Sequence, residues 1–186
     1  MQPGSRAVGV AESYEGDTST LAAAVVRRDR VVDGFGFGRC TVGGTDASDA
    51  AARLVTGLGR PDARVLFLSG IAPAWFNLFD LHAIRERVDR PVLSVSFEPS
   101  PGLGDALRRE FDGDALAERI DIYERQPPRR ELTVDGERLW VRAVGADDEA
   151  AARIVRAFTP EGGRPEPLRV ARLAARTGDA FARSEL

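Results

Sequence analysis

The chain has 186 residues, 43% of them hydrophobic and 30% charged, which is typical of a single globular domain covering residues 1–186. This composition excludes a disordered chain, and no stretch approaches the roughly 18 consecutive apolar residues that a membrane helix requires. The first residues lack a signal-peptide pattern, and Cys40 is the only cysteine. We therefore expect a cytoplasmic protein with no disulfide framework and no cysteine-built zinc site.

The type of the basic residues is unusual, whereas the net charge is not. The net charge of −3 excludes a general attraction to nucleic acid, and all 26 basic residues are arginines because the sequence contains no lysine. Arginine suits bidentate phosphate contacts, but alanine and arginine are enriched together, as GC-rich coding predicts. Only local clustering of arginines can therefore indicate a nucleic-acid site.

Three closely spaced strands are predicted at the start of the chain. Arg6 to Val10 is a short apolar strand, and Leu21 to Val26 is a continuous apolar run, typical of a strand buried on both faces. In the third, Val31 to Phe37, apolar residues and Asp33 share one face and glycines share the other. The short connections favour antiparallel pairing of these three strands.

Helices and strands then alternate. Apolar residues between 51 and 58 recur at helical spacing, and Asp46 or Thr45 can cap that helix. A strand at residues 65–68, a loop at 70–76, a helix holding Leu81 and Val88, and a strand at 91–97 follow. Asn77, with Asp80 three residues later, can begin the second helix. Because helical crossovers join parallel neighbours, we expect a mixed α/β sheet with the ribonuclease-H-like order.

In the second half of the chain, a β-hairpin and two helices at about residues 127–178 are predicted to complete the same domain. Helices are expected at 105–109 and 115–123, followed by strands at 131–134 and 138–144 that flank an Asp135-Gly136 hairpin turn. An acid-rich start at residues 147–149 indicates another helix, and the last helix begins at Pro167.

Five ordered blocks resemble one known family, the archaeal endonuclease dU family of endonuclease-V-like proteins. The blocks read PGSRAVGVAES, VDGFGFGRCTVGGTDAS, LSGIAPAWFNLFD, RPVLSVSFEPSPGL and RPEPLRVARLAAR. They extend over about residues 3 to 178, and five blocks in order are far more specific than one short motif. Composition and family together favour a haloarchaeal-type member working in a high-salt cytoplasm.

The resemblance implies an endonuclease-V-like fold, metal-dependent cleavage of nucleic acid at deaminated bases, and a role in DNA repair. Magnesium or manganese, held by acidic side chains, would activate a water and stabilise the leaving oxygen. The sequence departs from the family at two acidic positions, which are occupied here by Ala11 and Ser69, while Asp46 is retained. Cleavage would therefore depend on Asp46 and on Glu12, which lies beside Ala11.

Asp46 and Glu12 are accordingly the candidate catalytic and metal-binding residues. The alternative roles are a helix cap for Asp46 and a solvated strand end for Glu12. Asp17 and Asp33 are less specific acidic candidates. Alternation along a strand places Ala11 and Glu12 on opposite faces, so Glu12 replaces the missing acid only if the strand ends or bulges there.

Two further groups are candidates for nucleic-acid binding, with DNA the favoured partner. Trp75 and Phe76 can stack on a base or pack under the next helix, and Asn77 can cap that helix beside a phosphate. Basic residues also recur at helical spacing on one face of the last helix, where they form either a phosphate-contacting stripe or an ordinary solvated face. These residues are Arg169, Arg172 and Arg176.

The remaining candidates are weaker. His82, the only histidine, is more typical of a surface or packing residue than of a catalyst, and Cys40 of a packed side chain. No phosphate-binding glycine loop or serine-hydrolase elbow is present in the sequence. The sequence thus leaves open a metal-dependent endonuclease, a catalytically degenerate nucleic-acid-binding protein of the same fold, and a small-molecule or protein-interaction role.

Overall fold

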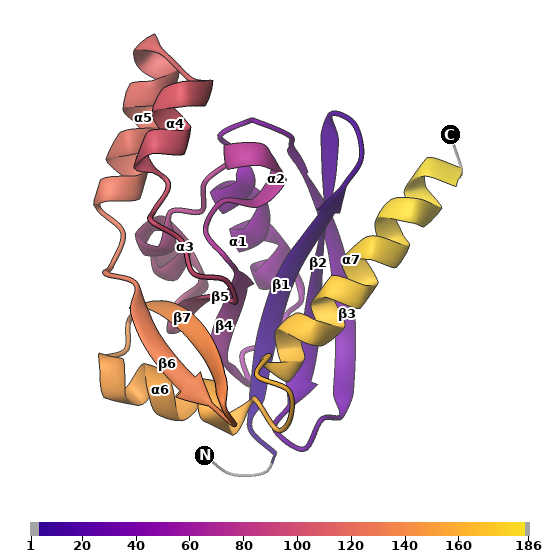
Figure 1. The fold of residues 1–186 in the computed structure, drawn as a ribbon. Helices are drawn as coiled ribbons and strands as arrows, with labels where there is room; N and C mark the ends of the chain where they lie inside the picture. The colour runs from indigo at the N-terminus through magenta and orange to yellow at the C-terminus, as the bar shows by residue number, and fades with distance from the viewer. Residues whose placement is uncertain (1–3, 185–186) are drawn as a thin grey trace.

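The computed structural model describes residues 4–184 and places them around one seven-stranded sheet in the order β3-β2-β1-β4-β5-β7-β6 (Figure 1). The strands are β1 Arg6–Tyr14, β2 Thr18–Arg27, β3 Val32–Thr41, β4 Ala63–Ser69, β5 Val92–Ser96, β6 Arg130–Val134 and β7 Glu137–Val144. The helices are α1 Ala47–Gly57, α2 Pro73–Phe76, α3 Leu81–Val88, α4 Gly104–Glu110, α5 Gly113–Glu124, α6 Asp148–Ala157 and α7 Glu166–Ser184.

The strand directions confirm the predicted ribonuclease-H-like sheet. β1, β2 and β3 are antiparallel neighbours, and β4 and β5 then add parallel to β1. The β6–β7 hairpin adds to the same sheet through antiparallel pairing of β7 with β5. Its turn, Asp135-Gly136, has positive φ at both residues (50° and 84°), the left-handed geometry that the Asp-Gly sequence favours.

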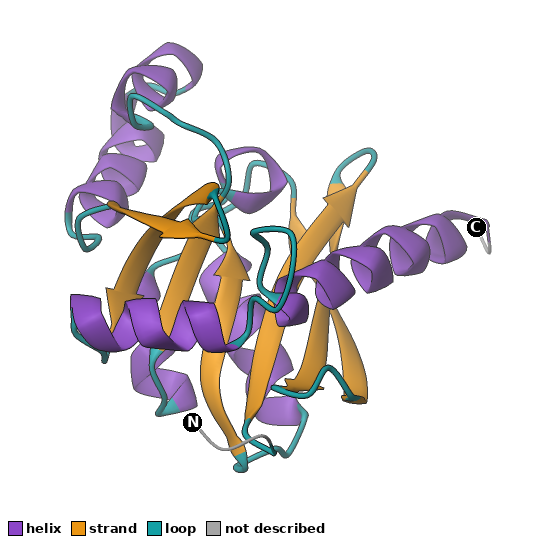
Figure 2. Ribbon diagram, turned by 60° about the horizontal axis from the view of Figure 1, so that its bottom comes forward, coloured by secondary structure: helices purple, strands orange, loops and turns teal. Residues whose placement is uncertain are grey.

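Helices cover both faces of the sheet (Figure 2). α1 and α3 pack on one face against a core that includes Val8, Val10 and Leu66. On the other face, Phe67 and Leu168 belong to the core beneath α6 and α7. β2 is buried on both faces, as its continuous apolar sequence predicts.

The two faces of β3 differ as their residue types require. The glycine face lies under α1, where a Cβ on Gly36 would come within 2.8 Å of the end of the Leu58 side chain, so glycine lets α1 pack closely without a shift of that side chain. The opposite face carries Phe35 and Phe37, which are 51% and 56% exposed. They line an apolar groove beside Phe181 of α7.

β1 is longer than predicted, and this corrects one local expectation. The predicted strand ended at Val10, but the register between β1 and β2 runs without interruption to Tyr14. Ala11 and Glu12 therefore lie inside a regular strand and point to opposite faces. The pairing with β2 extends the strand, a long-range effect that the short apolar run did not reveal.

The loop at residues 70–76 contains an unpredicted feature, the short α2. Ala74, Trp75 and Phe76 all have positive φ, between 46° and 61°, a conformation rare for residues other than glycine.

Within the described residues, no helix is long and apolar enough to cross a membrane.

Candidate functional site

Asp46 lies directly before α1, and donors from its own chain hold its carboxylate. The Thr41 backbone N–H donates at 3.0 Å, the Thr41 hydroxyl at 3.1 Å and the Asn77 amide at 2.7 Å. Burial raises the pKa of Asp46, but these donors outweigh it and hold the pKa below its ordinary value. Asp46 is therefore an ionised carboxylate that is already hydrogen-bonded internally.

Glu12 lies on the same side of the sheet, since it alternates with Val8 and Val10, which face α1. The Ser19 hydroxyl donates to its carboxylate at 3.0 Å. Burial, followed by Asp46 and Glu12, raises the pKa of the Cys40 thiol to about 11. The charges of the two predicted catalytic acids thus both act on one buried thiol, and we call Glu12, Cys40 and Asp46 the carboxylate cluster.

Ala11 and Ser69 lie on the opposite side of the sheet from that cluster. Ala11 packs against Val170 and Ala171 of α7. Ser69, at the end of β4, alternates with Phe67, which faces the α6 and α7 side. Glu12 therefore does not occupy the place of an acid at Ala11, because the regular strand directs it to the other face.

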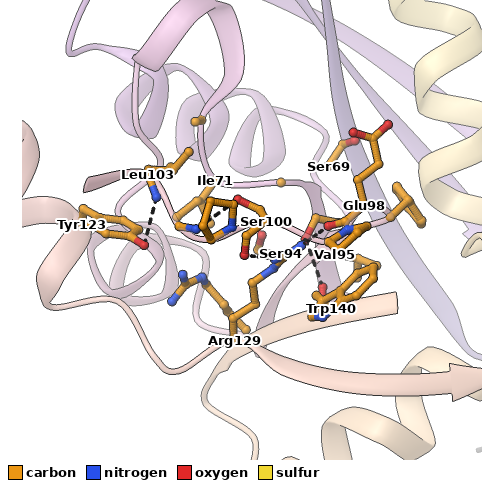
Figure 3. A pocket seen from close by; sticks show the side chains of 18 of the residues that line it. Ser69, Ile71, Ser94, Val95, Glu98, Ser100, Leu103, Tyr123, Arg129 and Trp140 are labelled. Carbon is orange, nitrogen blue, oxygen red and sulfur yellow. Dashed lines mark hydrogen bonds between the residues drawn. The ribbon is translucent and has the colours of Figure 1, made fainter. Parts of the chain in front are cut away.

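Ser69 lines a separate cavity of about 570 Å³ at the ends of β4 and β5. Figure 3 shows Tyr123 at one end of this cavity and Trp140 at the other, with Ser69 and Glu98 above Trp140 in this view. Four arginines also line it, from the segment before β6, from β7, from the segment before α7, and from α7 itself. We call the cavity the arginine pocket and define it by Arg129, Arg142, Arg164 and Arg172.

The arginines of the pocket form two pairs whose members repel each other. Burial, and then the charge of Arg142, lowers the pKa of Arg129. Burial, and then the charge of Arg172, lowers the pKa of Arg164. Among the described residues that line the pocket, Glu98 is the only acid. The pocket consequently has an excess of positive charge, which is suited to anions and opposed to metal cations.

The predicted base-stacking residues lie against another aromatic residue. The Trp75 and Phe76 rings lie 5.4 Å and 6.0 Å from Phe111, measured between ring centroids. Arg119 stacks on Phe111 and donates to the backbone carbonyls of Gly43 and Phe76. Phe76 is partly buried and Trp75 is 45% exposed, so the packing alternative describes most of this group and Trp75 keeps a free ring surface.

Asn77 corrects a prediction, because it does not cap the helix that follows it. Asp80 caps α3 by accepting from the backbone N–H groups of His82 and Ala83. Asn77 is fully buried, and its Oδ1 accepts from the Ala47 backbone N–H, the first of α1, at 2.9 Å. Its amide donates to Asp46 and to the Thr41 carbonyl. These contacts leave Asn77 no surface on which to meet a nucleic acid.

The three arginines predicted as a stripe on α7 have different surroundings. Glu166 binds both nitrogens of the Arg169 fork, at 2.7 Å and 2.6 Å, and so compensates its charge. Arg172 lines the arginine pocket. Arg176 is exposed on α7, outside that pocket. The structure therefore separates the stripe, and only Arg172 joins a cavity.

The weaker candidates lie elsewhere. Asp33 forms ion pairs with Arg6 and Arg60, and Asp17 is exposed in the turn between β1 and β2. The His82 ring is 3.2 Å from the Arg125 carbonyl oxygen. Neither Asp17 nor Asp33 lines the arginine pocket.

The metal ion that the family resemblance implies does not fit these residues. Within residues 4–184, no group of three or more His, Cys, Asp and Glu side chains could hold a metal ion. Asp46 is occupied by internal donors, and Ser69, where the resemblance places an acid, borders a cavity that four arginines also line. Removal of ligand charge weakens magnesium binding, and added positive charge weakens it further.

Sequence reasoning missed three of the four pocket arginines and also missed Arg119. The pocket residues come from segments separated by many residues, so no spacing rule joins them. A partial signal was available in β7, where Trp140 and Arg142 are two residues apart in a predicted strand and therefore lie on the same face. Arg119, which is 4% exposed, gave no signal because the carbonyls of Phe76 and Gly43, to which it donates, lie more than forty residues away.

Comparison with known proteins gives a consistent family. A family profile described as Endonuclease dU matches residues 3–178. A UPF0215 protein of Pyrobaculum calidifontis is 34% identical over 172 residues, which are 90% of this chain and 93% of that protein. Other UPF0215 proteins of archaea also match, among them one from Thermococcus kodakarensis that is 38% identical over 137 residues, 73% of this chain and 68% of that protein.

Solved structures share the fold at low sequence identity. A protein of unknown function from Archaeoglobus fulgidus has a TM-score of 0.82 at 22% identity, covering 92% of this chain and 96% of its own. Human ENDOV has a TM-score of 0.62 at 19% identity, and the match covers 96% of this chain and 86% of the human chain. Endonuclease V of Ciona intestinalis, in complex with an inosine-containing DNA, has a TM-score of 0.59 at 12% identity, covering 94% and 85%. The fold is thus endonuclease-V-like, and the chain belongs to the endonuclease dU family.

Proposed function

We propose that this protein binds nucleic acid through an endonuclease-V-like fold without metal-dependent cleavage. The observation that carries the proposal is the replacement of acids by other residues on the α7 side of the sheet. Ala11 packs there against α7, and Ser69 faces a cavity lined by four arginines. Phosphodiester hydrolysis by the metal route needs clustered carboxylates, and this donor set does not supply them.

Nucleic acid is the partner that this arrangement supports best. The arginine pocket lies at the ends of the parallel strands β4 and β5, the edge at which α/β sheets bind ligands. Guanidinium groups match phosphate oxygens in a bidentate geometry. The Ciona intestinalis Endonuclease V, which shares the fold, is in complex with DNA. DNA is therefore the first partner to test, and RNA the second.

One observation favours a second candidate, cleavage at deaminated bases in DNA repair with magnesium or manganese. Glu12 and Asp46 both lie close enough to Cys40 to raise the pKa of its thiol. Two carboxylates in one region are the minimum from which a metal site could be built. The Ser19, Thr41 and Asn77 donors that occupy them argue against this candidate.

A combined binding and nicking assay separates the two candidates. Single- and double-stranded DNA and RNA, with and without uracil or hypoxanthine, would be incubated with magnesium or manganese over a wide salt range. The range extends to high salt because the sequence predicts a haloarchaeal-type protein, and salt weakens phosphate contacts. We expect binding without nicking.

The matched variants are Asp46→Asn and Glu12→Gln, each checked for folding by thermal melting. Nicking by the wild-type protein that either substitution abolishes would refute the proposal and establish the second candidate. Absence of binding to every substrate at low salt would refute both candidates. Binding that both variants retain, without nicking, is the result that the proposal requires.

A further inference from the structure

We infer that the arginine pocket binds two phosphate groups of one nucleic-acid strand, one at each arginine pair, without a metal ion. This inference rests on the proposed function and names the chemical group that the site takes. The first pair is Arg129 with Arg142, and the second is Arg164 with Arg172.

The first argument is that no ion pair among residues 4–184 compensates the four pocket arginines, and that Glu98 is the single acid among the described residues that line the pocket. Among the ion pairs of the described residues, none involves Arg129, Arg142, Arg164 or Arg172. Arg169 and Arg125, by contrast, each have a carboxylate within 3 Å. Like charges that are brought together on folding repel each other unless an anion lies between them.

The second argument is that neutral groups hold the first pair in place. Arg129 donates to the Ser96 hydroxyl at 2.9 Å and also to the Glu98 backbone carbonyl. Arg142 donates to the Pro127 carbonyl. These oxygens orient the guanidinium groups but do not neutralise them. The first pair is therefore positioned in advance and remains fully charged, as a phosphate site requires.

The third argument concerns the aromatic rings beside each pair. Arg129 lies 4.8 Å from the Trp140 ring centroid, and Arg164 lies 3.6 Å from that of Phe97. A ring that stacks on one face of a guanidinium restricts its motion and leaves the N–H edge free for an oxyanion. Arg164 and Arg172 donate no hydrogen bond within residues 4–184, so their N–H groups are available.

The test measures the affinity of a short single-stranded DNA by fluorescence anisotropy in EDTA, between about 50 and 400 mM salt. The main variant is Arg164→Gln/Arg172→Gln. These two arginines donate no hydrogen bond to a backbone carbonyl of residues 4–184, so their replacement removes no such contact from the fold. We expect at least about tenfold weaker binding and a salt slope smaller by about 0.7 for each phosphate that the variant no longer neutralises. Arg129→Gln should weaken binding in the same direction, through the other pair.

Two controls accompany these variants. Arg53→Gln/Arg153→Gln removes two exposed arginines outside the pocket lining, so it changes the net charge equally and should leave the affinity within about twofold. Arg164→Lys/Arg172→Lys retains the charge without the planar fork and should fall between the wild type and the glutamine variant. Thermal melting confirms that each variant is folded.

Isothermal titration with pyrophosphate in EDTA provides a probe that does not depend on nucleic-acid binding. We expect pyrophosphate to bind the wild-type protein, to compete with the DNA, and to lose affinity in the Arg164→Gln/Arg172→Gln variant. Pyrophosphate binding without DNA or RNA binding would refute the proposed function and the assignment of the pocket to a strand.

Other results would overturn the inference alone. If the glutamine variant binds DNA as tightly as the wild type, the pocket is not the phosphate site, although the proposed function stands. If the salt slope falls as much in the Arg53/Arg153 control, the effect is one of net charge. If magnesium strengthens DNA binding and EDTA abolishes it, the site is metal-dependent and the inference is wrong.

Discussion

The carboxylate cluster and the arginine pocket both gather charged side chains, but they differ in how those charges are compensated. Asp46 receives hydrogen bonds from Thr41 and Asn77, and Glu12 receives one from Ser19. In the pocket, neutral oxygens hold Arg129 and Arg142, and their charge remains. The cluster that the sequence singled out is thus occupied by internal contacts, whereas the pocket has capacity for a ligand.

The difference shows that residue type alone is a weak guide to a site. An aspartate before a helix can be a metal ligand or can organise a loop, and only its neighbours distinguish the two roles. Here the donors from Thr41 and Asn77 make Asp46 part of the connection between β3, α1 and α2. The same criterion, applied to arginines without a carboxylate partner, identifies the pocket.

The largest expected effect is on stability, from Asn77→Ala. This substitution leaves the buried Ala47 N–H without its acceptor and removes a donor from the partly buried Asp46. We expect a loss of about 3 kcal/mol in the free energy of unfolding, measured by urea denaturation. Thr45→Ala, at an exposed neighbouring position, should change it by less than about 0.5 kcal/mol. A cost of under about 1 kcal/mol for Asn77→Ala would show that the cluster is not held together as described.

Asp46→Asn should cost about 1–2 kcal/mol at neutral pH, because an amide replaces a carboxylate that accepts from Thr41 and Asn77. The folded pKa of Asp46 lies below its ordinary value of 3.8. Its contribution is therefore complete above that value and is lost as the pH falls through the lower folded pKa. Urea denaturation at a series of pH values should show the variant and the wild type converging in acid. A difference that persists at low pH would contradict an ionised, hydrogen-bonded Asp46.

Ser69→Asp tests the pocket with a single added charge. The new carboxylate would lie in the same cavity as Arg172 and would compensate part of its positive charge. We expect about tenfold weaker binding of single-stranded DNA by fluorescence anisotropy. Ser69→Asn, similar in size but neutral, is the matched control and should bind nearly as the wild type does. Tighter binding by Ser69→Asp in the presence of magnesium would instead indicate a latent metal site.

The smallest effect is expected for Asp62→Asn, in an exposed ion-pair network with Arg60 and Arg6. The Arg60 hydrogen bond lowers the pKa of Asp62 from 3.8 to about 2. Its contribution is present above 3.8 and is lost as the pH falls toward 2. Because the pair is solvent-exposed, we expect less than about 1 kcal/mol at neutral pH and a further decrease with added salt. A larger, salt-insensitive effect would show that the network is more buried than its exposure indicates.

The positions of the strands and of most helices were predictable because they depend on local patterns. Alternating and continuous apolar runs defined the strands, and Asp135-Gly136 defined the hairpin. The glycine face of β3 was also visible in the sequence, although its packing against α1 was not. These features repeat every two or three to four residues, so a short window of sequence contains them.

The candidate site was less predictable because its contacts join distant segments. Asn77 bonds to Ala47 across thirty residues, and that bond decided its role against the local capping pattern. Arg129 directly precedes the edge strand β6, whereas Arg172 lies on α7, which packs on β1 and β2, and yet both line one cavity. Sequence spacing carries no information about such pairs, since the sheet alone brings them together.

By itself, the sequence determined the family, the order of the secondary-structure elements apart from α2, and the absence of acids at residues 11 and 69. Only the tertiary structure decided that Glu12 does not replace an acid at Ala11, because regular pairing with β2 turns it to the other face. It also decided which arginines are compensated, because an ion pair depends on distance in space. That distance is determined when the sheet and its helices pack together.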